Sequence, residues 1–217
     1  MPEGADARDA LPRGHRVRIA AALTLLLAAG RALAGSPAFF PADAERGGRL
    51  AGPCLTCHGP ANPPLGSPPV HPPKLIGERS DAIFLALLEY QRGMRTNPIM
   101  QAVAAPLSLQ DLRDLSAYLA AEGPLHPPTS ADANSWAHDK VHRDCTACHG
   151  ETGMGEMWGI PVLTGQNRDY LVAALMAYRD GTRRNPTMGP IAARLAPQEI
   201  EQLATYFAHQ TQLRLTR

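Results

Sequence analysis

Two copies of one short motif carry the chemistry of this sequence. Cys54-Leu-Thr-Cys57-His58 recurs 91 residues later as Cys145-Thr-Ala-Cys148-His149. Two thiols spaced in this way and followed directly by a histidine form the attachment sequence for c-type haem. Both thiols add to the haem vinyl groups, and the histidine reaches the iron from the proximal side. The spacing therefore predicts two covalently bound haem c groups, one for each motif.

Two other chemistries also use pairs of cysteines. The four thiols of Cys54, Cys57, Cys145 and Cys148 could form one tetrahedral zinc site, or two disulfides in an exported protein. Neither alternative explains why a histidine follows both pairs, or why a methionine follows each pair within a matching segment. The pattern favours haem.

The sixth iron ligand decides what such a haem does, because an open iron binds small molecules whereas two strong ligands make an electron carrier. Among seven methionines, Met100 and Met188 occupy the same repeat position, each in an Asn-Pro-x-Met segment. Thioether sulfur is a soft ligand that favours ferrous iron. We therefore predict the axial pairs His58/Met100 and His149/Met188. The rival ligands do not recur in the other copy: Met94, Met154, Met157, His71, His126, His138, His142 and His209.

The repeat extends well beyond the cysteines. Pro73-Lys-Leu-Ile-Gly77 recurs as Pro161-Val-Leu-Thr-Gly165, and the segment from Arg95 to Met100 recurs from Arg183 to Met188, both at an offset of 88 residues. The three-residue difference falls in one proline-rich loop of the first copy. We expect two small domains of one fold, 35–123 and 131–217, joined by the proline-rich linker 124–130.

Apolar residues at helical spacing predict three helices in each copy. A short helix precedes each cysteine motif, at 42–52 and 134–143. A second helix follows and is stopped by Gly93 or Gly181, and the last one begins near Ser108 or Pro197. No alternating strand pattern competes with these helices, so the predicted fold class is all-α.

The N-terminus is typical of a secretory signal. Arginines precede an apolar run at 19–29, and Ala32-Leu-Ala34 follows as a cleavage site. The run is too short to cross a bilayer, which needs about 20 residues, although an uncleaved anchor is the alternative. We expect residues 1–34 to be removed and the rest to reach the periplasm. The charge balance of 21 Lys+Arg against 20 Asp+Glu excludes a nucleic-acid binder that relies on a strong positive field.

Taken together, these motifs resemble the two-haem class I cytochromes c of the cytochrome c4 type over residues 40–210. The resemblance implies two tandem class I cytochrome c domains, each a small helical bundle around one haem. It also implies that the carbonyls of Pro73 and Pro161 accept hydrogen bonds from His58 and His149. Gly47 stands where this family has a glycine that lets the first and last helices cross closely, whereas the second copy has His138 there.

The function implied by the resemblance is single-electron transfer in the periplasm, without catalysis. The implied partners are redox proteins: a quinol-oxidising complex or a dehydrogenase upstream, and a haem-copper oxidase or another reductase downstream. Nucleic acid is not among them, and any association with a membrane is peripheral. Two alternatives remain, a two-haem peroxidase-like enzyme and the cytochrome subunit of a periplasmic dehydrogenase. The paired Asn-Pro-x-Met segments argue against the peroxidase.

Overall fold

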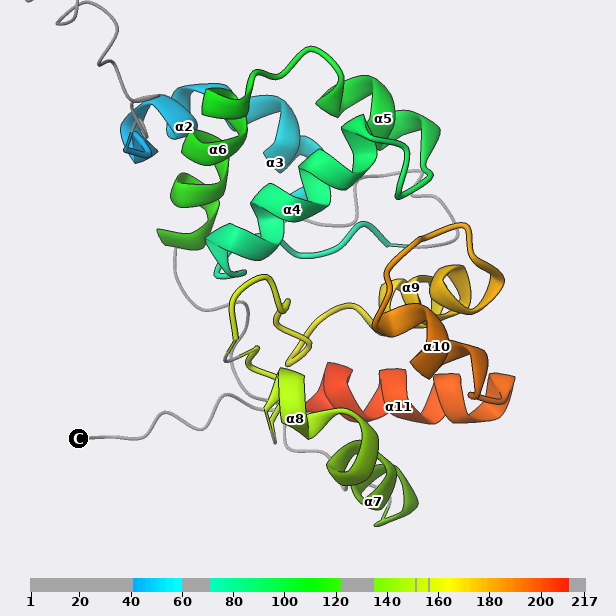
Figure 1. Cartoon of the computed structure of the whole chain (residues 1–217). Coiled ribbons are helices and arrows are strands. Elements are labelled where there is room, and N and C mark those ends of the chain that lie inside the picture. The colour runs from blue at the N-terminus through cyan, green and yellow to red at the C-terminus, as the bar shows by residue number, and fades with distance from the viewer. Residues whose placement is uncertain (1–40, 60–70, 122–134, 151, 156, 211–217) are drawn as a thin grey trace, which may run out of the picture. The chain divides into compact units, whose positions relative to one another are not determined.

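Each copy of the repeat folds into five helices in the computed structural model, which describes residues 41–59, 71–121, 135–150, 152–155 and 157–210 (Figure 1). The first copy contains α2 (Ala44–Leu50), α3 (Gly52–His58), α4 (Ser80–Gln91), α5 (Pro98–Ala104) and α6 (Leu109–Ala121). The second contains α7 (Ser135–Asp144), α8 (Thr146–His149), α9 (Arg168–Asp180), α10 (Met188–Ala193) and α11 (Pro197–His209). Within these ranges the only β-type pairing is one isolated bridge, so the predicted all-α class is confirmed.

Three predicted features lie outside the described residues. They are the signal 1–34, the proline-rich loop around Pro63–Pro69 and the linker 124–130. The division into domains 35–123 and 131–217 therefore stays a prediction. Among the helices that are described, none has the length and apolar character needed to span a membrane.

The predicted helix boundaries follow from local chemistry. Gly93 (φ 65°) follows the end of α4, and Gly181 (φ 80°) caps α9, both in the left-handed region that favours glycine. At the start of α6, the amide and hydroxyl of Ser108 donate to the carboxylate of Asp111, and the amide of Asp111 donates back to the Ser108 hydroxyl. This reciprocal pair is the capping box that the sequence predicts.

Each copy has two short helices besides the three predicted. They are α3 and α8, which hold the cysteine motifs, and α5 and α10, which carry Met100 and Met188. Asn97 begins α5 because its side chain accepts the Met100 amide, and Pro98 occupies the first turn. An Asn-Pro pair is a recognisable helix start, since Asn is a good N-cap and Pro fits the first helical position.

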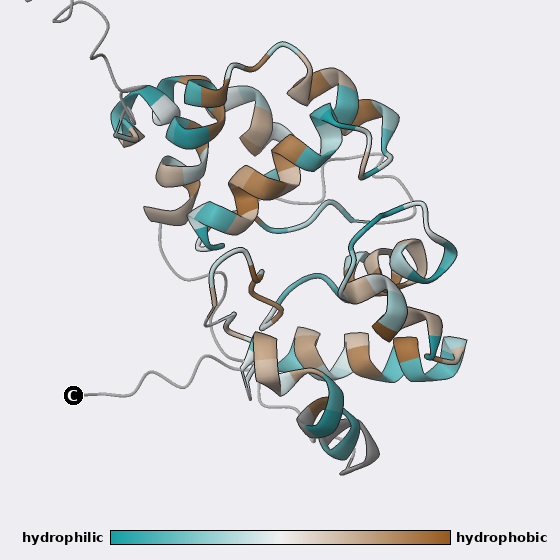
Figure 2. Cartoon of the chain, in the orientation of Figure 1, coloured by the Kyte–Doolittle hydropathy of each residue, from teal (hydrophilic) through white to brown (hydrophobic). Residues whose placement is uncertain are grey.

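Each copy has its own apolar core along its last helix. In the first copy Leu112, Leu115 and Leu119 of α6 are at most 2% exposed. In the second copy one cluster contains Val141 of α7 together with Ile200, Leu203 and Phe207 of α11, among others. Figure 2 shows apolar residues in brown along α4 and α11, whereas α2 and α7 are mostly hydrophilic.

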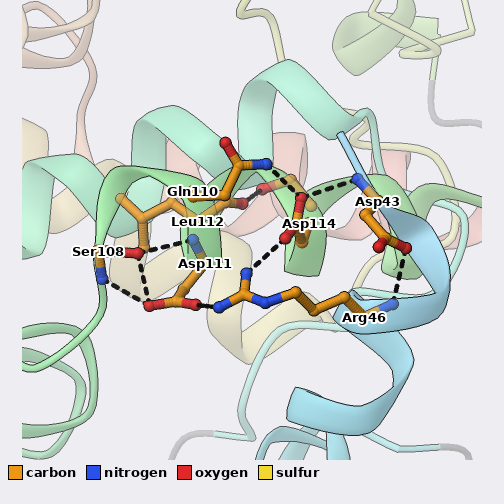
Figure 3. Close-up of polar contacts among 8 residues, drawn as sticks. Asp43, Arg46, Ser108, Gln110, Asp111, Leu112 and Asp114 are labelled. Carbon is orange, nitrogen blue, oxygen red and sulfur yellow. Dashed lines mark hydrogen bonds and ion pairs between the residues drawn. The ribbon is translucent and has the colours of Figure 1, made fainter. Parts of the chain in front are cut away.

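The first copy ties its N-terminal helix to α6 through a close backbone approach. A Cβ atom added to Gly47 would lie only 2.0 Å from the carbonyl oxygen of Asp114, so the position requires glycine. The side chain of Asp114 is fully buried and accepts hydrogen bonds from the Asp43 amide (2.8 Å), Arg46 (2.5 Å) and Gln110 (2.8 Å). Arg46 also pairs with Asp111 (Figure 3). The expected helix crossing at Gly47 is confirmed.

The second copy makes the corresponding contact differently. His138 replaces Gly47, and the position of Asp114 is taken by the exposed Gln202. Here α7 packs on α11 through Val141, which is 1% exposed. Lys140 adds a distant ion pair with Glu199, at 3.8 Å. The crossing in the second copy is therefore apolar where that of the first copy is polar.

The two copies contact each other through matching residues, within the compact unit that begins at Ala42. Asp81 accepts the Gly159 amide at 2.8 Å, and Asp169, its counterpart in the second copy, accepts the His71 amide at 2.5 Å. Arg95 and Arg183, also counterparts, form the one antiparallel bridge. His71 and Gly159 are also counterparts in the repeat, so the same contact occurs twice with the roles of the two copies exchanged. The interface therefore has approximate two-fold symmetry.

Candidate haem sites

Short helices hold each cysteine motif. The segment from Cys54 to His58 lies within α3, which has a proline in its first turn, and Cys145 caps α8, which ends at His149. All four cysteines have free thiols, so neither pair forms the disulfide considered as an alternative. Among the described residues no three His, Cys, Asp or Glu side chains come together to hold a metal ion, which argues against the zinc alternative.

Both motif histidines are fixed in the orientation that an iron ligand needs. The ring Nδ1–H of His58 donates to the Pro73 carbonyl at 2.6 Å, and that of His149 donates to the Pro161 carbonyl at 3.2 Å. The side of each ring that carries Nε2 is thereby left available for a metal. Burial lowers the pKa of both histidines, which favours the neutral, ligating form. The expected proline contacts are confirmed.

A cavity of about 420 Å³ brings the residues of the second site together. Cys145, Cys148 and His149 lie on its wall, and so does Met188 of α10. Most of the remaining wall is apolar, with side chains such as Leu171, Leu175, Ile191, Leu195 and Phe207. A flat, largely apolar macrocycle with an iron at its centre requires this combination of attachment thiols, two ligand side chains and apolar walls.

The first copy contributes wall residues such as Glu78 and Arg95 to this cavity, but its predicted haem residues Cys54, Cys57, His58 and Met100 are not among the lining residues. Their local geometry nevertheless matches that of the second copy. The side-chain oxygen of Asn97 accepts the Met100 amide at 3.0 Å, and that of Asn185 accepts the Met188 amide at 2.9 Å. An asparagine therefore fixes the backbone of each methionine. Met100 and Met188 are both half-buried.

Two arginines line the cavity beside the interface, Arg95, which is buried, and Arg183, which is largely buried. The guanidinium of Arg95 lies over the Tyr90 ring at 4.7 Å and donates to the Tyr170 hydroxyl at 2.7 Å. Arg183 lies over the Tyr178 ring at 4.4 Å, and its buried Nε–H has no hydrogen-bond partner. Arg183 also forms an ion pair with Glu89 at 3.6 Å, and this carboxylate oxygen of Glu89 likewise has no hydrogen-bond partner. The unpaired Nε–H of Arg183 and the charge of Arg95 suit the carboxylates that a haem carries.

The rival ligands are placed as follows. Met157 also lines the cavity but is 53% exposed. Met94 contributes its carbonyl oxygen, which accepts the amide of Arg184 at 2.8 Å. His71 bonds through Nδ1 to Asp169 at 2.6 Å, and the ring of His209 bonds to a carbonyl of its own helix. His126 and the side chains of His138 and His142 lie outside the part of the chain that is described.

Sequence reasoning missed the interface residues around the cavity. Glu78 and Gln166, 7% and 3% exposed, occupy the same repeat position and bond across the interface. Their chemistry is not apparent from the motifs because a lone acidic residue before a helix is usually solvated. The only signal was the repeat itself, in which Glu78 and Gln166 differ while their surroundings match.

Comparisons with known proteins show which family of proteins the chain resembles. A family model described as cytochrome c oxidase, cbb3-type, subunit III matches residues 137–207. The thiosulfate dehydrogenase electron acceptor of Stutzerimonas stutzeri is 35% identical over 172 residues, covering 72% of this chain and 78% of the relative. Cytochrome c4 of Pseudomonas aeruginosa is 32% identical, covering 76% and 87%. The crystal structure of reduced recombinant cytochrome c4 from Pseudomonas stutzeri has a TM-score of 0.67 and 28% identity, covering 78% of this chain and 99% of that one.

These relatives establish the fold, the cofactor and the function. The fold is that of two class I cytochrome c domains, and the chain binds two covalent haem c groups. It exchanges electrons with redox partners and is not an enzyme, which removes the peroxidase alternative. The protein is an electron-transfer cytochrome that belongs to the diheme cytochrome c4 family.

Proposed function

We propose that this cytochrome accepts electrons in the periplasm from a dehydrogenase that oxidises thiosulfate, and passes them on singly through two His/Met-ligated haems. Support for the donor comes from the relative named as a thiosulfate dehydrogenase electron acceptor, which is 35% identical to this chain. The downstream partner is an oxidase or another reductase. In this proposal the signal 1–34 is cleaved during export, and residues 35–123 and 131–217 form the two haem domains.

One observation carries the ligand assignment. A single cavity is lined by Cys145, Cys148, His149 and Met188, with His149 already oriented by the Pro161 carbonyl. The matching hydrogen bonds of His58 and Met100 support the same arrangement in the first copy. Cys54, Cys57 and His58 with Met100 would hold one haem, and Cys145, Cys148 and His149 with Met188 the other.

The haem supplies a reversible one-electron couple between ferric and ferrous iron. The protein contributes attachment, a wall of apolar side chains that keeps water away, and a sulfur ligand that favours the ferrous state. Arg95 and Arg183 would offset the negative charge of the haem carboxylates inside this wall. No bond of a substrate is made or broken.

Optical spectra of single variants test the ligands. The ferric holoprotein should show two low-spin haems and a methionine-sulfur to iron band. Met100→Ala and Met188→Ala should each remove about half of that band and make one haem of the two bind carbon monoxide. Met157→Ala is the matched control, because Met157 lines the same cavity but does not recur. If Met157→Ala removes the band of the second haem instead, the assignment of Met188 is wrong.

Reduction by an enzyme tests the donor. The ferric holoprotein is mixed with a purified thiosulfate dehydrogenase and thiosulfate, and the haem absorption is followed in a stopped-flow instrument. Rapid reduction that requires both enzyme and thiosulfate is the expected result. Reduction by ascorbate but not by the enzyme would reject the proposed donor while leaving the haem ligands intact. Purification of the native protein with a catalytic subunit attached would identify a permanent subunit rather than a free carrier.

A further inference from the structure

One peptide group joins Glu78 of the first copy to the haem ligand of the second. The carbonyl of Pro161 accepts the ring N–H of His149 at 3.2 Å. The N–H of the same peptide group belongs to Val162 and donates to the carboxylate of Glu78 at 2.8 Å. A side chain of one copy is therefore connected to the proximal histidine of the other by two hydrogen bonds and one peptide group.

The same connection is built a second time in the opposite direction. The Pro73 carbonyl accepts the ring N–H of His58 at 2.6 Å, and the N–H of Lys74 donates to the side-chain oxygen of Gln166 at 2.9 Å. Gln166 is the counterpart of Glu78 in the repeat. The two connections use matching hydrogen bonds but differ in charge, because one ends in a carboxyl group and the other in an uncharged amide. Gln166 also donates its amide N–H to the Lys74 carbonyl at 3.0 Å, a bond that a carboxylate cannot make.

We propose that Glu78, when ionised, lowers the reduction potential of the second haem through the peptide group between Pro161 and Val162, and that Gln166 holds the corresponding place for the first haem without a charge. Glu78 is a positioning residue for electron transfer, since it acts through His149 and not on the iron itself. The inference rests on the proposed assignment of His58 and His149 as proximal ligands.

The physical basis is polarisation of the shared peptide. A negative charge that accepts the Val162 N–H makes the Pro161 carbonyl a stronger acceptor for the His149 ring. A more strongly hydrogen-bonded imidazole is more basic and stabilises ferric iron over ferrous iron, which lowers the potential. An amide oxygen at position 166 accepts the same kind of hydrogen bond but adds no net charge, so the first haem lacks this effect.

The surroundings of Glu78 make its charge sensitive to pH near neutrality. Burial raises the pKa of Glu78, and the hydrogen bonds from the Val162 and Arg79 amides with the charge of Arg79 offset only part of this, leaving it at about 7. Asp81 raises it further. From the second copy, the hydroxyl of Tyr170 is the titratable group that interacts with Glu78.

The other charged side chains on the cavity wall are four cations and two acids: Lys74, Arg95, Lys140, Arg183, Glu89 and Asp144. Burial raises the pKa of Tyr170, but the charges of Arg95 and Arg183 outweigh it and lower this pKa. Lys74 donates to the Gly165 carbonyl at 2.8 Å. When ferric iron accepts one electron from its donor, the carboxylate of Glu78 takes up a fraction of one proton from water, and reoxidation returns it. The potential of the second haem should then fall as pH rises through neutrality, while that of the first stays level.

Potentiometric titration of the full-length holoprotein between pH 5.5 and 8.5 tests this. In the wild type, one of the two potentials should fall with rising pH. Glu78→Gln keeps the acceptor oxygen and should raise that potential at pH 8 and remove its slope. A tenfold difference in proton affinity between the two redox states corresponds to about 59 mV. Gln166→Glu should create a slope at the other haem.

Asp81→Asn is the matched control. Asp81 is a neighbouring carboxylate that bonds across the same interface, to the Gly159 amide, but it is not connected to a haem ligand. It should keep the slope but move its midpoint to lower pH, because the charge of Asp81 no longer raises the pKa of Glu78. An unchanged slope in Glu78→Gln would overturn the proposal, because it would show that Glu78 is not coupled to the haem. Loss of the slope in both variants would also overturn it, because it would indicate a general effect of charge at the interface.

A spectroscopic readout separates this proposal from the ligand assignment. In the ferrous protein, the nuclear magnetic resonance of the His149 ring N–H should shift between pH 6 and pH 8 in the wild type, but not in Glu78→Gln. The corresponding His58 resonance should stay constant. Low-spin spectra with no pH shift at His149 would reject the role of Glu78 while retaining the haem ligands. If the wild-type protein showed no low-spin haem spectrum, the proposed haem ligands would instead be wrong.

Discussion

The two copies solve one packing problem in different ways. In the first, α2 crosses α6 at Gly47 and is held by the buried carboxylate of Asp114. In the second, α7 lies on α11 through the apolar side chain of Val141. The repeated fold therefore requires that the first helix pack on the last, but does not dictate whether polar or apolar contacts do it. The polar crossing requires a glycine at position 47 and an acidic residue at position 114. The apolar crossing has His138 and Gln202 at the equivalent positions.

The largest effect should come from closing the space at Gly47. Gly47→Ala places a methyl group against the Asp114 carbonyl, which is backbone and cannot move aside. We expect the free energy of unfolding to fall by about 3 kcal/mol or more. The control is Gly48→Ala in the same helix, where the new methyl meets only the Tyr118 ring at 3.1 Å. Chemical denaturation measures both, and equal effects would show that the crossing does not depend on Gly47.

Truncating the apolar contact in the second copy should have the next largest effect. Val141→Ala removes two methyl groups from a core position that is 1% exposed. We expect a loss of about 2 kcal/mol from the lost burial and the cavity left behind. Hydrogen exchange should locate the destabilisation in α7 and α11 and leave α2 unchanged. A loss below about 0.5 kcal/mol would mean that Val141 does not hold α7 in place.

Acid should affect the two crossings differently. Burial raises the pKa of Asp114, but the hydrogen bonds from the Asp43 amide, Arg46 and Gln110 outweigh it, so the pKa lies below its usual range. The stabilisation by this carboxylate is thus present above the unfolded pKa of about 4 and is lost as pH falls through the folded pKa. Hydrogen exchange at decreasing pH should show α2 opening before α7. In Asp114→Asn, α2 should open already at neutral pH. If α2 and α7 of the wild type opened at the same pH, the predicted difference between the two crossings would be wrong.

The smallest effect concerns the starts of the two last helices. Ser108 caps α6 through its hydroxyl, whereas its counterpart Ala196 only donates its amide to Glu199, at 2.7 Å. Ser108→Ala should cost about 1 kcal/mol, and Ala196→Ser should gain up to about 1 kcal/mol by completing the second capping box. Thermal denaturation of both variants measures the pair. A destabilising Ala196→Ser would show that α11 does not begin as α6 does.

Much of the fold followed from the sequence because its signals are local. Glycines at positive φ, the capping box at Ser108 and the apolar spacing of the last helices each depend on neighbours in the chain. The cysteine motifs were informative for the same reason, since attachment to haem needs thiols and histidine at fixed spacing. The short helices α5 and α10 were not predicted although Asn97-Pro98 marks the start of one of them, because the Asn-Pro-x-Met segments were used only to assign the iron ligands.

What the sequence could not show depends on contacts between residues far apart. Glu78 bonds to Val162, and Arg95 to Tyr170, across the interface between the copies. No spacing rule predicts such pairs, and an isolated Glu before a helix gives no sign that it will be buried. The repeat indicates which residues are counterparts, but not that counterparts would exchange partners across an approximate two-fold axis.

That axis has an evolutionary consequence. In a dimer of two identical chains, any substitution appears on both sides of the interface at once, so the two sites must change together. Here one polypeptide contains both sides, and each position can be altered alone. Glu78 and Gln166 occupy one symmetric place with different side chains, a difference that identical subunits could not encode. Fusion of the two copies thus allows the two haem environments to diverge while the interface that joins them is preserved.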